Sequence, residues 1–261
     1  MTMRRRSPKL RRFLLWGLLV LAPAGFAACP PPPTAPEIGV KRVIDGDTLV
    51  LADGRHVRFI GINAMELGHG LGPDQPYADA ARDRIKQLIA AGGGKLRLEG
   101  GEEAYDEHDR SLAYLFAGRE DLGLELVKEG LAVVIAVPPN IARLGCYADT
   151  EAQARAAGLN IWSKDSPLIT DAAHADMTPG AFLIVHDAIT GVVRNSAGVR
   201  LSVGGRLTLW ISNPDLARFT ANPAELKGRQ VLVRGWVREY RGRPELDIHA
   251  PAALIPLPLT N

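Results

Sequence analysis

The sequence contains few cysteines and no histidine pattern that suits a zinc site. Cys29 and Cys146 are the two cysteines among 261 residues, which excludes a framework of several disulfides. The chain is therefore expected to fold around ordinary hydrophobic cores, since 46% of its residues are apolar. The histidines show no metal-ligand spacing and are expected to be surface or supporting residues: His56, His69, His108, His174, His186 and His249.

The N-terminal segment has no acidic residue and no apolar run long enough to span a bilayer. Its first 28 residues carry six basic side chains, and the uncharged stretch from position 13 to position 28 has 16 residues. A transmembrane helix needs roughly 20. A basic start, a short apolar run and small residues are typical of a secretory signal peptide. We therefore expect residues 1–28 to be a signal segment and the protein to be exported, to the cell envelope or periplasm or into the medium.

The end of the signal segment leaves the role of Cys29 open. The sequence FAAC at positions 26–29 resembles a lipobox, which predicts lipid attachment at Cys29 and a membrane anchor. Ordinary cleavage near the APA stretch at 22–24 is one alternative. A Cys29–Cys146 bridge in a chain cut further upstream is another.

Composition divides the remaining chain into two units. Residues 29–37 are proline-rich and are expected to form an extended spacer, and the polar residues 166–180 an interdomain linker. Two domains are then predicted, over 38–165 and 181–261. Without the leader the chain has 25 basic and 29 acidic residues, so its formal charge changes from +2 to −4. Overall basicity therefore gives no indication of nucleic-acid binding.

Residues 38–165 have the pattern of a small closed β-barrel with helices. Three short strands separated by Asp-Gly turns come first. An apolar stripe at helical spacing runs from Tyr77 to Ile89, and the glycines at 92–94 end that helix. Two more strands, a short helix from Leu122 and a last helix over 150–158 follow. The expected fold class is mainly β with α.

From residue 181 the pattern is all β, and we expect a second, smaller OB-like β-barrel. Alternation along one strand puts Arg234, Trp236, Arg238 and Tyr240 on a single face. Interleaved arginine and aromatic side chains suit single-stranded nucleic acid. The alternative is an outer sheet with Trp236 packed on the first domain. The strand candidates cover 182–193, 198–203, 206–212, 230–240 and 245–249.

Four sequence blocks carry a resemblance to a known family. A DGDT stretch alone is also a plain turn, but these blocks in this order resemble staphylococcal-nuclease-like domains over residues 38–163. The resemblance implies an OB barrel with three helices and a phosphodiester-hydrolysing activity. The blocks are VIDGDTL at 43–49, VRFIGINAME at 57–66, DRSLAY at 109–114, and EAQAR with GLNIW at 151–155 and 158–162.

The resemblance also implies a metal site of oxygen donors. Asp47 and Asn63 would bind through their side chains and Ala64 through its carbonyl, and such donors suit Ca²⁺. The family usually has aspartate where this chain has Asn63, and one formal charge fewer is expected to weaken metal affinity. Met65 stands in place of the usual proline, which predicts a less rigid loop.

The same resemblance assigns the catalytic side chains. Arg58 and Arg110 would hold the phosphate, because a guanidinium offers a planar fork of donors, and Glu66 would position or deprotonate the attacking water. Taken singly, Arg58 could face solvent, Glu66 could cap a loop and Arg110 could form a surface ion pair. Glu107 and His108 replace a lysine and a nucleotide-stacking tyrosine of the staphylococcal enzyme. Residues 37–170 carry 15 basic and 21 acidic side chains, a net of −6, which predicts poor steering of a polyanion.

Together these features predict a metal-dependent nuclease that acts on DNA or RNA outside the cytoplasm, with the second domain helping to hold substrate. Two alternatives remain open. One is a catalytically weak or inactive exported lipoprotein that binds nucleic acid or an envelope partner. The other is a structural envelope module in which both barrels bind protein.

Overall fold

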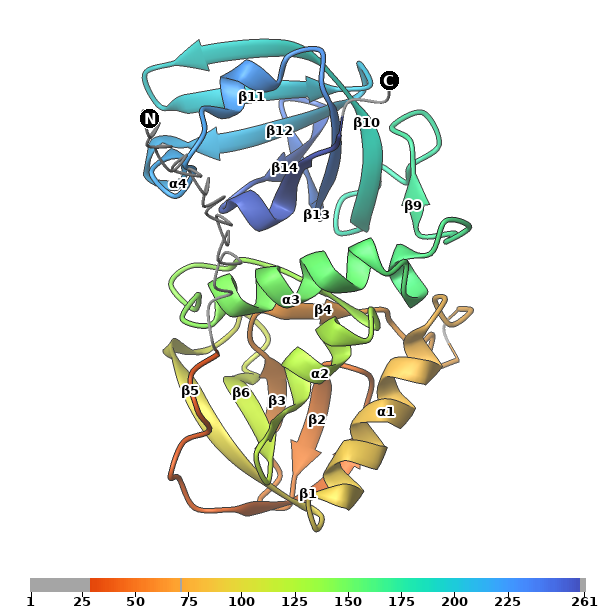
Figure 1. Ribbon diagram of the computed structural model, residues 1–261, viewed down its shortest axis with the longest axis vertical. Helices are drawn as coiled ribbons and strands as arrows, with labels where there is room; N and C mark the ends of the chain where they lie inside the picture. The colour runs from red at the N-terminus through yellow and green to blue at the C-terminus, as the bar shows by residue number, and fades with distance from the viewer. Residues whose placement is uncertain (1–28, 71, 259–261) are drawn as a thin grey trace, which may run out of the picture.

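The computed structural model describes residues 29–70 and 72–258, which form two β units with helix α3 lying between them (Figure 1). The first unit holds strands β1 to β8 with helices α1 to α3, and the second holds β9 to β15. The predicted signal segment, residues 1–28, lies outside the described residues. Within the part of the chain that the structure describes, no helix is long and apolar enough to cross a membrane.

Five strands of the first unit close into a barrel. The sheet order is β3-β2-β1-β5-β6-β7, and a parallel pairing of β3 with β6 joins its two sides. Inward side chains such as Leu49, Val57 and Leu115 are buried in one core. The predicted five-stranded barrel is confirmed. Its strands are β1 (Ile38–Val43), β2 (Thr48–Leu51), β3 (His56–Phe59), β5 (Lys95–Tyr105) and β6 (Ser111–Ala117), with β7 (Glu120–Asp121) added at the edge.

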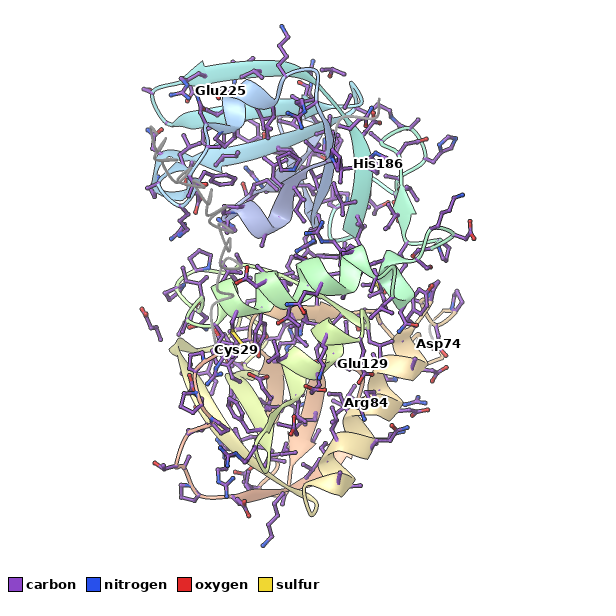
Figure 2. The ribbon with its side chains drawn as sticks, in the orientation of Figure 1. Cys29, Asp74, Arg84, Glu129, His186 and Glu225 are labelled. Atoms are coloured by element: carbon purple, nitrogen blue, oxygen red, sulfur yellow. A yellow bond between two sulfur atoms is a disulfide. The ribbon has the colours of Figure 1, made fainter. Side chains whose placement is uncertain are left out.

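Two helices cover this barrel where the apolar periodicity predicted them. Helix α1 (Ala78–Ala91) buries the predicted stripe, and helix α2 (Leu122–Lys128) begins at Asp121, whose carboxylate caps its first turn. An ion pair joins the two helices, with Nη2 of Arg84 2.8 Å from Oε1 of Glu129 (Figure 2).

Helix α3 (Leu144–Ala156) begins six residues before the predicted start at residue 150. No side chain caps its first turn, so the sequence carries no start signal there. Tertiary contacts hold that turn instead: Cys146 and Tyr147 are buried in the first core. The Tyr147 hydroxyl also donates to Asp121, with 2.7 Å between the oxygens.

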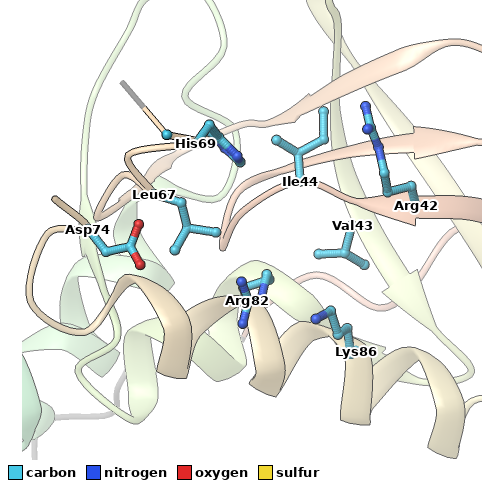
Figure 3. A pocket seen from close by; sticks show the side chains of 9 residues that line it. Arg42, Val43, Ile44, Leu67, His69, Asp74, Arg82 and Lys86 are labelled. Carbon is cyan, nitrogen blue, oxygen red and sulfur yellow. The ribbon is translucent and has the colours of Figure 1, made fainter. Parts of the chain in front are cut away.

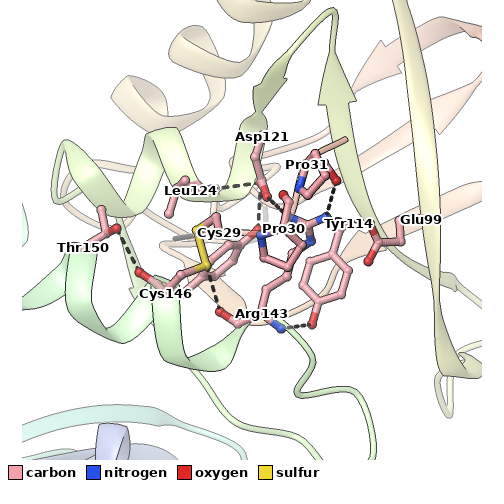
Figure 4. A network of polar contacts seen from close by, with 11 residues as sticks. Cys29, Pro30, Pro31, Glu99, Tyr114, Asp121, Leu124, Arg143, Cys146 and Thr150 are labelled. Atoms are coloured by element: carbon pink, nitrogen blue, oxygen red, sulfur yellow. Dashed lines mark hydrogen bonds and ion pairs between the residues drawn. A yellow bond between two sulfur atoms is a disulfide. The ribbon is translucent and has the colours of Figure 1, made fainter. Parts of the chain in front are cut away.

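Cys29 forms a disulfide with Cys146 (Figure 4). The guanidinium of Arg143 donates to the carbonyls of Pro30 and Pro31, at 2.8 and 3.3 Å, so the start of the predicted spacer lies against the barrel. The predicted lipid attachment at Cys29 is therefore wrong for this structure, because its sulfur is bonded to another cysteine. The two cysteines are 117 residues apart in sequence, and no local pattern indicates the pairing.

The second unit repeats the strand order of the first. Strands β10, β11, β12, β14 and β13 follow one another around the sheet, and pairing of β13 with β10 closes it. The β12–β14 pairing is parallel, like β3–β6. The predicted second sheet is present, and β9 shows that part of the expected linker belongs to it. The strands are β9 (Ile169–Thr170), β10 (Phe182–Asn195), β11 (Gly198–Val203), β12 (Leu207–Ser212), β13 (Gln230–Tyr240), β14 (Arg243–Asp247) and β15 (Leu254–Pro256), with the short helix α4 (Asn213–Leu216) after β12.

A third apolar cluster joins the two units. It includes side chains from residues 65–67, from α3 and the short 3₁₀ turn Asn160–Trp162, and from the outer face of β10 and β13. Because these side chains are buried between the barrels, the two units are held by a hydrophobic interface as well as by the connecting chain. The buried members are Met65, Leu67, Ala78, Val133, Ala154, Ile161, Trp162, Ile184 and Leu232.

Candidate active site

A cavity of about 760 Å³ opens where the two barrels meet. Four of the side chains predicted to form the site line it, Arg58, Asn63, Glu66 and Arg110. Trp236 of the second barrel lines it as well. The structure therefore brings together residues that are up to 52 positions apart in the first domain, and it adds a wall from the second.

The Asp45-Gly46-Asp47 turn lies behind this cavity and needs glycine at its centre. A Cβ at Gly46 would lie 2.6 Å from the Cβ of Ala64 and 2.7 Å from that of Ala81. Asp45 Oδ1 accepts a hydrogen bond from the Asp47 N–H at 2.9 Å, which fixes the turn. The turn is thus packed against the strand that carries Ala64 and against α1.

Asp47 is buried, with 1% of its surface exposed. Burial raises the pKa of its carboxyl group to about 6, although the nearby charge of Arg58 lowers it. Asp47 Oδ2 also accepts the N–H of Ala64 at 2.6 Å. The structure thus shows Ala64 as a donor to Asp47, and the role predicted for its carbonyl stays a prediction.

Arg58 on β3 links the predicted metal ligands. Its Nη1 lies 2.7 Å from Asp47 Oδ2, and its Nη2 donates to Asn63 Oδ1 at 2.9 Å. Nη1 also donates to the Ile62 carbonyl at 3.1 Å. The simpler interpretation, in which Arg58 faces solvent, is wrong because the residue is 9% exposed and held by three oxygens.

A short two-stranded sheet positions Asn63. Strand β4 (Ile62–Ala64) pairs with β8 (Ala132–Val134), with Asn63 opposite Val133. The sequence pattern did not separate these strands from their neighbours. Asp47 and Asn63 contact the two terminal nitrogens of one guanidinium, so both oxygens face the same group. Their oxygen chemistry fits a hard divalent ion such as Ca²⁺.

Charged side chains alone do not make a metal site here. Among the described residues no group of three or more histidine, cysteine, aspartate or glutamate side chains is arranged to hold a metal ion. A cation here would depend on the amide oxygen of Asn63, and on main-chain or water oxygens, beside the Asp47 carboxylate.

Glu66 stands at the exposed side of the cavity. Partial loss of solvent raises the pKa of its carboxyl group, the negative charge of Asp47 adds to that rise, and Arg58 and Arg110 oppose it. Gln75 fixes its backbone on both sides: the Glu66 N–H donates to Gln75 Oε1 at 2.8 Å, and the Gln75 N–H donates to the Glu66 carbonyl at 2.9 Å. Glu66 is therefore held by a residue that the sequence did not single out.

Arg110 is held by the loop that precedes it. Its Nε donates to Asp106 Oδ2 at 2.7 Å, while Asp106 Oδ1 accepts the backbone N–H groups of His108 and Arg110. Partial burial would raise the pKa of Asp106, but these hydrogen bonds and the Arg110 charge lower it. Arg110 does form the ion pair expected of a surface residue, yet its side chain also lines the cavity that Glu66 lines.

Asn140 also lines the cavity, and the sequence did not single it out. Its side chain accepts the Glu103 N–H at 3.0 Å and donates to the Glu103 carbonyl at 2.9 Å. A Cβ at Gly101 would lie 2.3 Å from Asn140 Oδ1, so the strand must approach closely there. No local pattern could have identified Asn140, because its partners are 37 residues away.

A second cavity, of about 670 Å³, lies between α1 and the β1–β2 turn (Figure 3). Arg42, Arg82 and Lys86 line it, with Asp74 opposite. The charges of Arg82 and Lys86 are paired with aspartates on α1. None of the predicted site residues lines this cavity, so the site is the cavity between the barrels.

Comparison with known proteins identifies the family of the first barrel. A family model described as "Staphylococcal nuclease homologue" matches residues 56–164. The thermonuclease of Staphylococcus intermedius is 38% identical over 128 residues, which are 48% of this chain and 75% of that relative. The chain belongs to the staphylococcal nuclease family. The thermonuclease of Staphylococcus hyicus is 36% identical over 127 residues, 48% of this chain and 74% of the relative. Endonuclease YncB of Bacillus subtilis is 33% identical over 132 residues, 49% and 62% of the two chains.

The second barrel lies outside the residues matched by the staphylococcal nuclease family model. Its predicted nucleic-acid residues lie in three environments: Arg234 between the barrels, Trp236 at the cavity, and Arg238 with Tyr240 among paired charges. Arg234 is 2% exposed and lies between the barrels. Its Nε donates to the Val134 carbonyl at 2.8 Å and its Nη2 pairs with Glu151 of α3. The prediction that Arg234 binds nucleic acid is therefore wrong. Strand alternation assigned the outer face correctly, but the first barrel covers that face.

Arg238 and Tyr240 lie further along the same strand, in a cluster of paired charges. Arg238 forms ion pairs with Glu245 and Asp247. Arg200 lies 4.6 Å from the ring centre of Tyr240, and the guanidinium groups of Arg238 and Arg241 lie within 5.5 Å of it. The ring is thus already surrounded by cations of its own barrel. Nucleic-acid binding by Arg238 and Tyr240 stays a prediction without support from this arrangement.

Proposed function

We propose that this chain is a nuclease that depends on a divalent metal ion, with Ca²⁺ as the fitting ion, and that it cleaves DNA or RNA outside the cytoplasm. Its family and its thermonuclease and endonuclease relatives make it an enzyme that hydrolyses phosphodiester bonds. The observation that carries the proposal for this site is the convergence of Arg58, Arg110 and Glu66 on one cavity.

The side chains of the cavity suit the demands of this reaction. Attack on a phosphodiester adds charge to oxygens that are already anionic, so donors fixed around that position stabilise the transition state. The guanidinium groups of Arg58 and Arg110 provide such donors in a partly buried site. Glu66, whose pKa is raised, is a better proton acceptor than an ordinary glutamate, and it is assigned to the attacking water.

Asp47 and Asn63 would hold the metal ion. When bound, a divalent ion adds positive charge near the phosphate oxygens. In the structure Arg58 neutralises the Asp47 carboxylate and occupies the Asn63 oxygen. We expect a bound cation to compete with Arg58 for these two oxygens, which would release guanidinium donors toward the substrate.

Export is supported by the chemistry of the N-terminal segment and of the cysteines. Residues 1–28 have the composition of a signal peptide. The Cys29–Cys146 disulfide is a bond that persists in oxidising compartments and is rare in the cytosol.

The proposal is tested with the protein lacking residues 1–28, incubated with single-stranded DNA or RNA in Ca²⁺, in Mg²⁺ and in chelator. Cleavage that requires a metal ion and is lost in Arg58→Ala, Glu66→Ala and Arg110→Ala supports it. Binding of the strand without turnover in any metal ion would contradict it and favour the alternative of an exported binding protein. Cleavage that survives all three substitutions would place the reaction elsewhere.

A further inference from the structure

We propose that Trp236 of the second barrel stacks on a nucleotide base beside the phosphate that Arg58 and Arg110 hold, so that the substrate site is complete only when both barrels are present. This rests on the proposed function and names the substrate class: a single strand of nucleic acid with an accessible base. The family match ends before this barrel, so the residue is a feature of this chain's own second unit.

The position of Trp236 points to a ligand rather than to packing alone. The residue is 41% exposed, although large apolar side chains of the second barrel are mostly buried. It lines the cavity that Arg58, Glu66 and Arg110 line. Val137, which is 49% exposed, lines the same cavity from the first barrel. An exposed tryptophan and an exposed valine therefore line the cavity that also holds the charged side chains of the candidate site.

The indole of Trp236 is held in place without being enclosed. Phe182 on the paired strand contacts it edge-to-face, with ring centres 4.9 Å apart. On the following residue, the Val237 N–H donates to the Ala181 carbonyl and the Val237 carbonyl accepts the Gly180 N–H, both at 2.8 Å. A ring fixed on a paired strand loses little conformational freedom when a base stacks on it.

The first barrel offers little to a base in this cavity. Of the aromatic rings in the lining, Phe59 is only 3% exposed and His108 is a small imidazole. The rim near Arg110 carries Glu103, Asp106 and Glu107, which repel a polyanion. These acidic side chains offset the attraction of Arg58 and Arg110 for phosphate, and stacking on an indole adds affinity that does not depend on phosphate charge.

Stacking on Trp236 also requires a substrate with unpaired bases. A base inside a duplex is stacked on its neighbours and paired, so it cannot reach Trp236 unless it leaves the helix. Single strands and frayed ends present their bases freely. Every base has an aromatic face, so the site would accept DNA and RNA bases with little sequence preference.

The test compares Trp236→Ala with the unmodified protein on two labelled single strands of equal length. One carries normal bases, and the other consists of abasic sugar phosphates. Loss of the indole should raise KM for the base-bearing strand about 5- to 150-fold. It should leave the KM for the abasic strand within about two-fold of that of the unmodified enzyme. Trp236→Phe should retain most of the affinity. Trp210→Ala, in the same barrel but away from the cavity, is the control and should change neither value.

Equal losses on both strands would overturn the proposal, as would an unchanged KM for the base-bearing strand. If the unmodified protein cleaves neither strand, the proposed nuclease function fails, but the stacking site is still decided by binding. Fluorescence anisotropy in chelator should then show weaker binding of the base-bearing strand by Trp236→Ala than by the unmodified protein. Equal binding by the two proteins would reject the site.

Discussion

The two barrels have the same strand order but use their charged residues differently. In the first barrel Arg58 and Glu66 line the cavity, and Asp47 lies behind it in an ion pair with Arg58. In the second, the net charge of residues 171–261 is +2, from 10 basic and 8 acidic side chains. Four of these ten basic side chains form ion pairs within the protein. The pairs are Arg200 with Glu245, Arg218 with Asp215, Arg234 with Glu151, and Arg238 with Glu245 and Asp247.

The net charge of each barrel does not indicate which barrel carries the candidate phosphate site. The acidic barrel carries the candidate phosphate site, because two guanidinium groups are placed correctly there despite a net charge of −6 over residues 37–170. The basic barrel contributes one uncharged ring, Trp236, to the same cavity. Function is determined by which side chains meet at the interface and not by the average composition of either unit.

The largest effect is expected at the ion pair that joins the barrels. Arg234→Ala removes the nearer of two cations from the buried Glu151 and leaves Arg155, whose Nε lies 3.9 Å from the carboxylate; burial already raises the pKa of that carboxyl group. The free energy of unfolding should fall by about 3–5 kcal/mol, measured by urea denaturation. Arg234→Met combined with Glu151→Leu should recover part of the loss, because the buried charge is gone but the Val134 N–H and carbonyl lose these two partners. A loss below about 1 kcal/mol, as for an exposed pair, would show that the barrels are not joined through this contact.

The next largest effect is expected on catalytic rate, and it should follow arginine loss in the first barrel but not in the second. Arg110→Ala should lower kcat about 10²- to 10³-fold, because a donor to the developing phosphate charge is removed. Arg218→Ala in the second barrel is a closely matched control: both arginines pair with a nearby aspartate, and their side chains are 33% and 32% exposed. Initial rates on a single-stranded substrate should differ between these variants while their stabilities change little. Equal rates would remove Arg110 from the site.

The disulfide should make the stability of the first barrel depend on redox conditions. It ties residues 117 positions apart, and both ends lie at the first barrel. Reduction should lower the free energy of unfolding by about 2–4 kcal/mol. Cys146→Ser should show the same lowered stability in the absence of reductant and no further response to it. Unfolding of the unmodified protein that is indifferent to reductant would contradict a disulfide in solution.

Much of the first barrel was predictable because its information is local. The apolar stripe of α1 and the Asp-Gly turn at 45–46 each lie within a short window, and the resemblance placed Arg58, Asn63 and Glu66 near one another. The structure brings these side chains to one cavity. The support from Gln75 was not predictable, because it depends on a hydrogen bond across nine residues of loop.

The errors arose where one unit covers the other. The alternation of side chains along a strand identifies the face on which Arg234 and Trp236 lie, but it does not show what packs against that face. The first barrel buries Arg234 and leaves Trp236 open at the cavity. At Cys29 the local FAAC pattern favoured a lipid over the Cys29–Cys146 bridge, because nothing in the sequence shows that these two residues lie close together in the fold.

The smallest predicted effect concerns the missing charge at the metal site. Asn63→Asp adds a carboxylate beside Asp47, and affinity for Ca²⁺, measured by calorimetric titration, should rise on the order of ten-fold because ligand charge sets the affinity of such sites. Without the ion, the added repulsion should lower stability, and saturating Ca²⁺ should restore it. Asn140→Asp introduces the same charge at another buried asparagine of the cavity, one that binds Glu103 and does not contact Arg58. If the two variants gain equal affinity, the effect is general electrostatics and Asn63 is no ligand. A gain confined to Asn63→Asp would place the cation between Asp47 and residue 63, where Arg58 now lies.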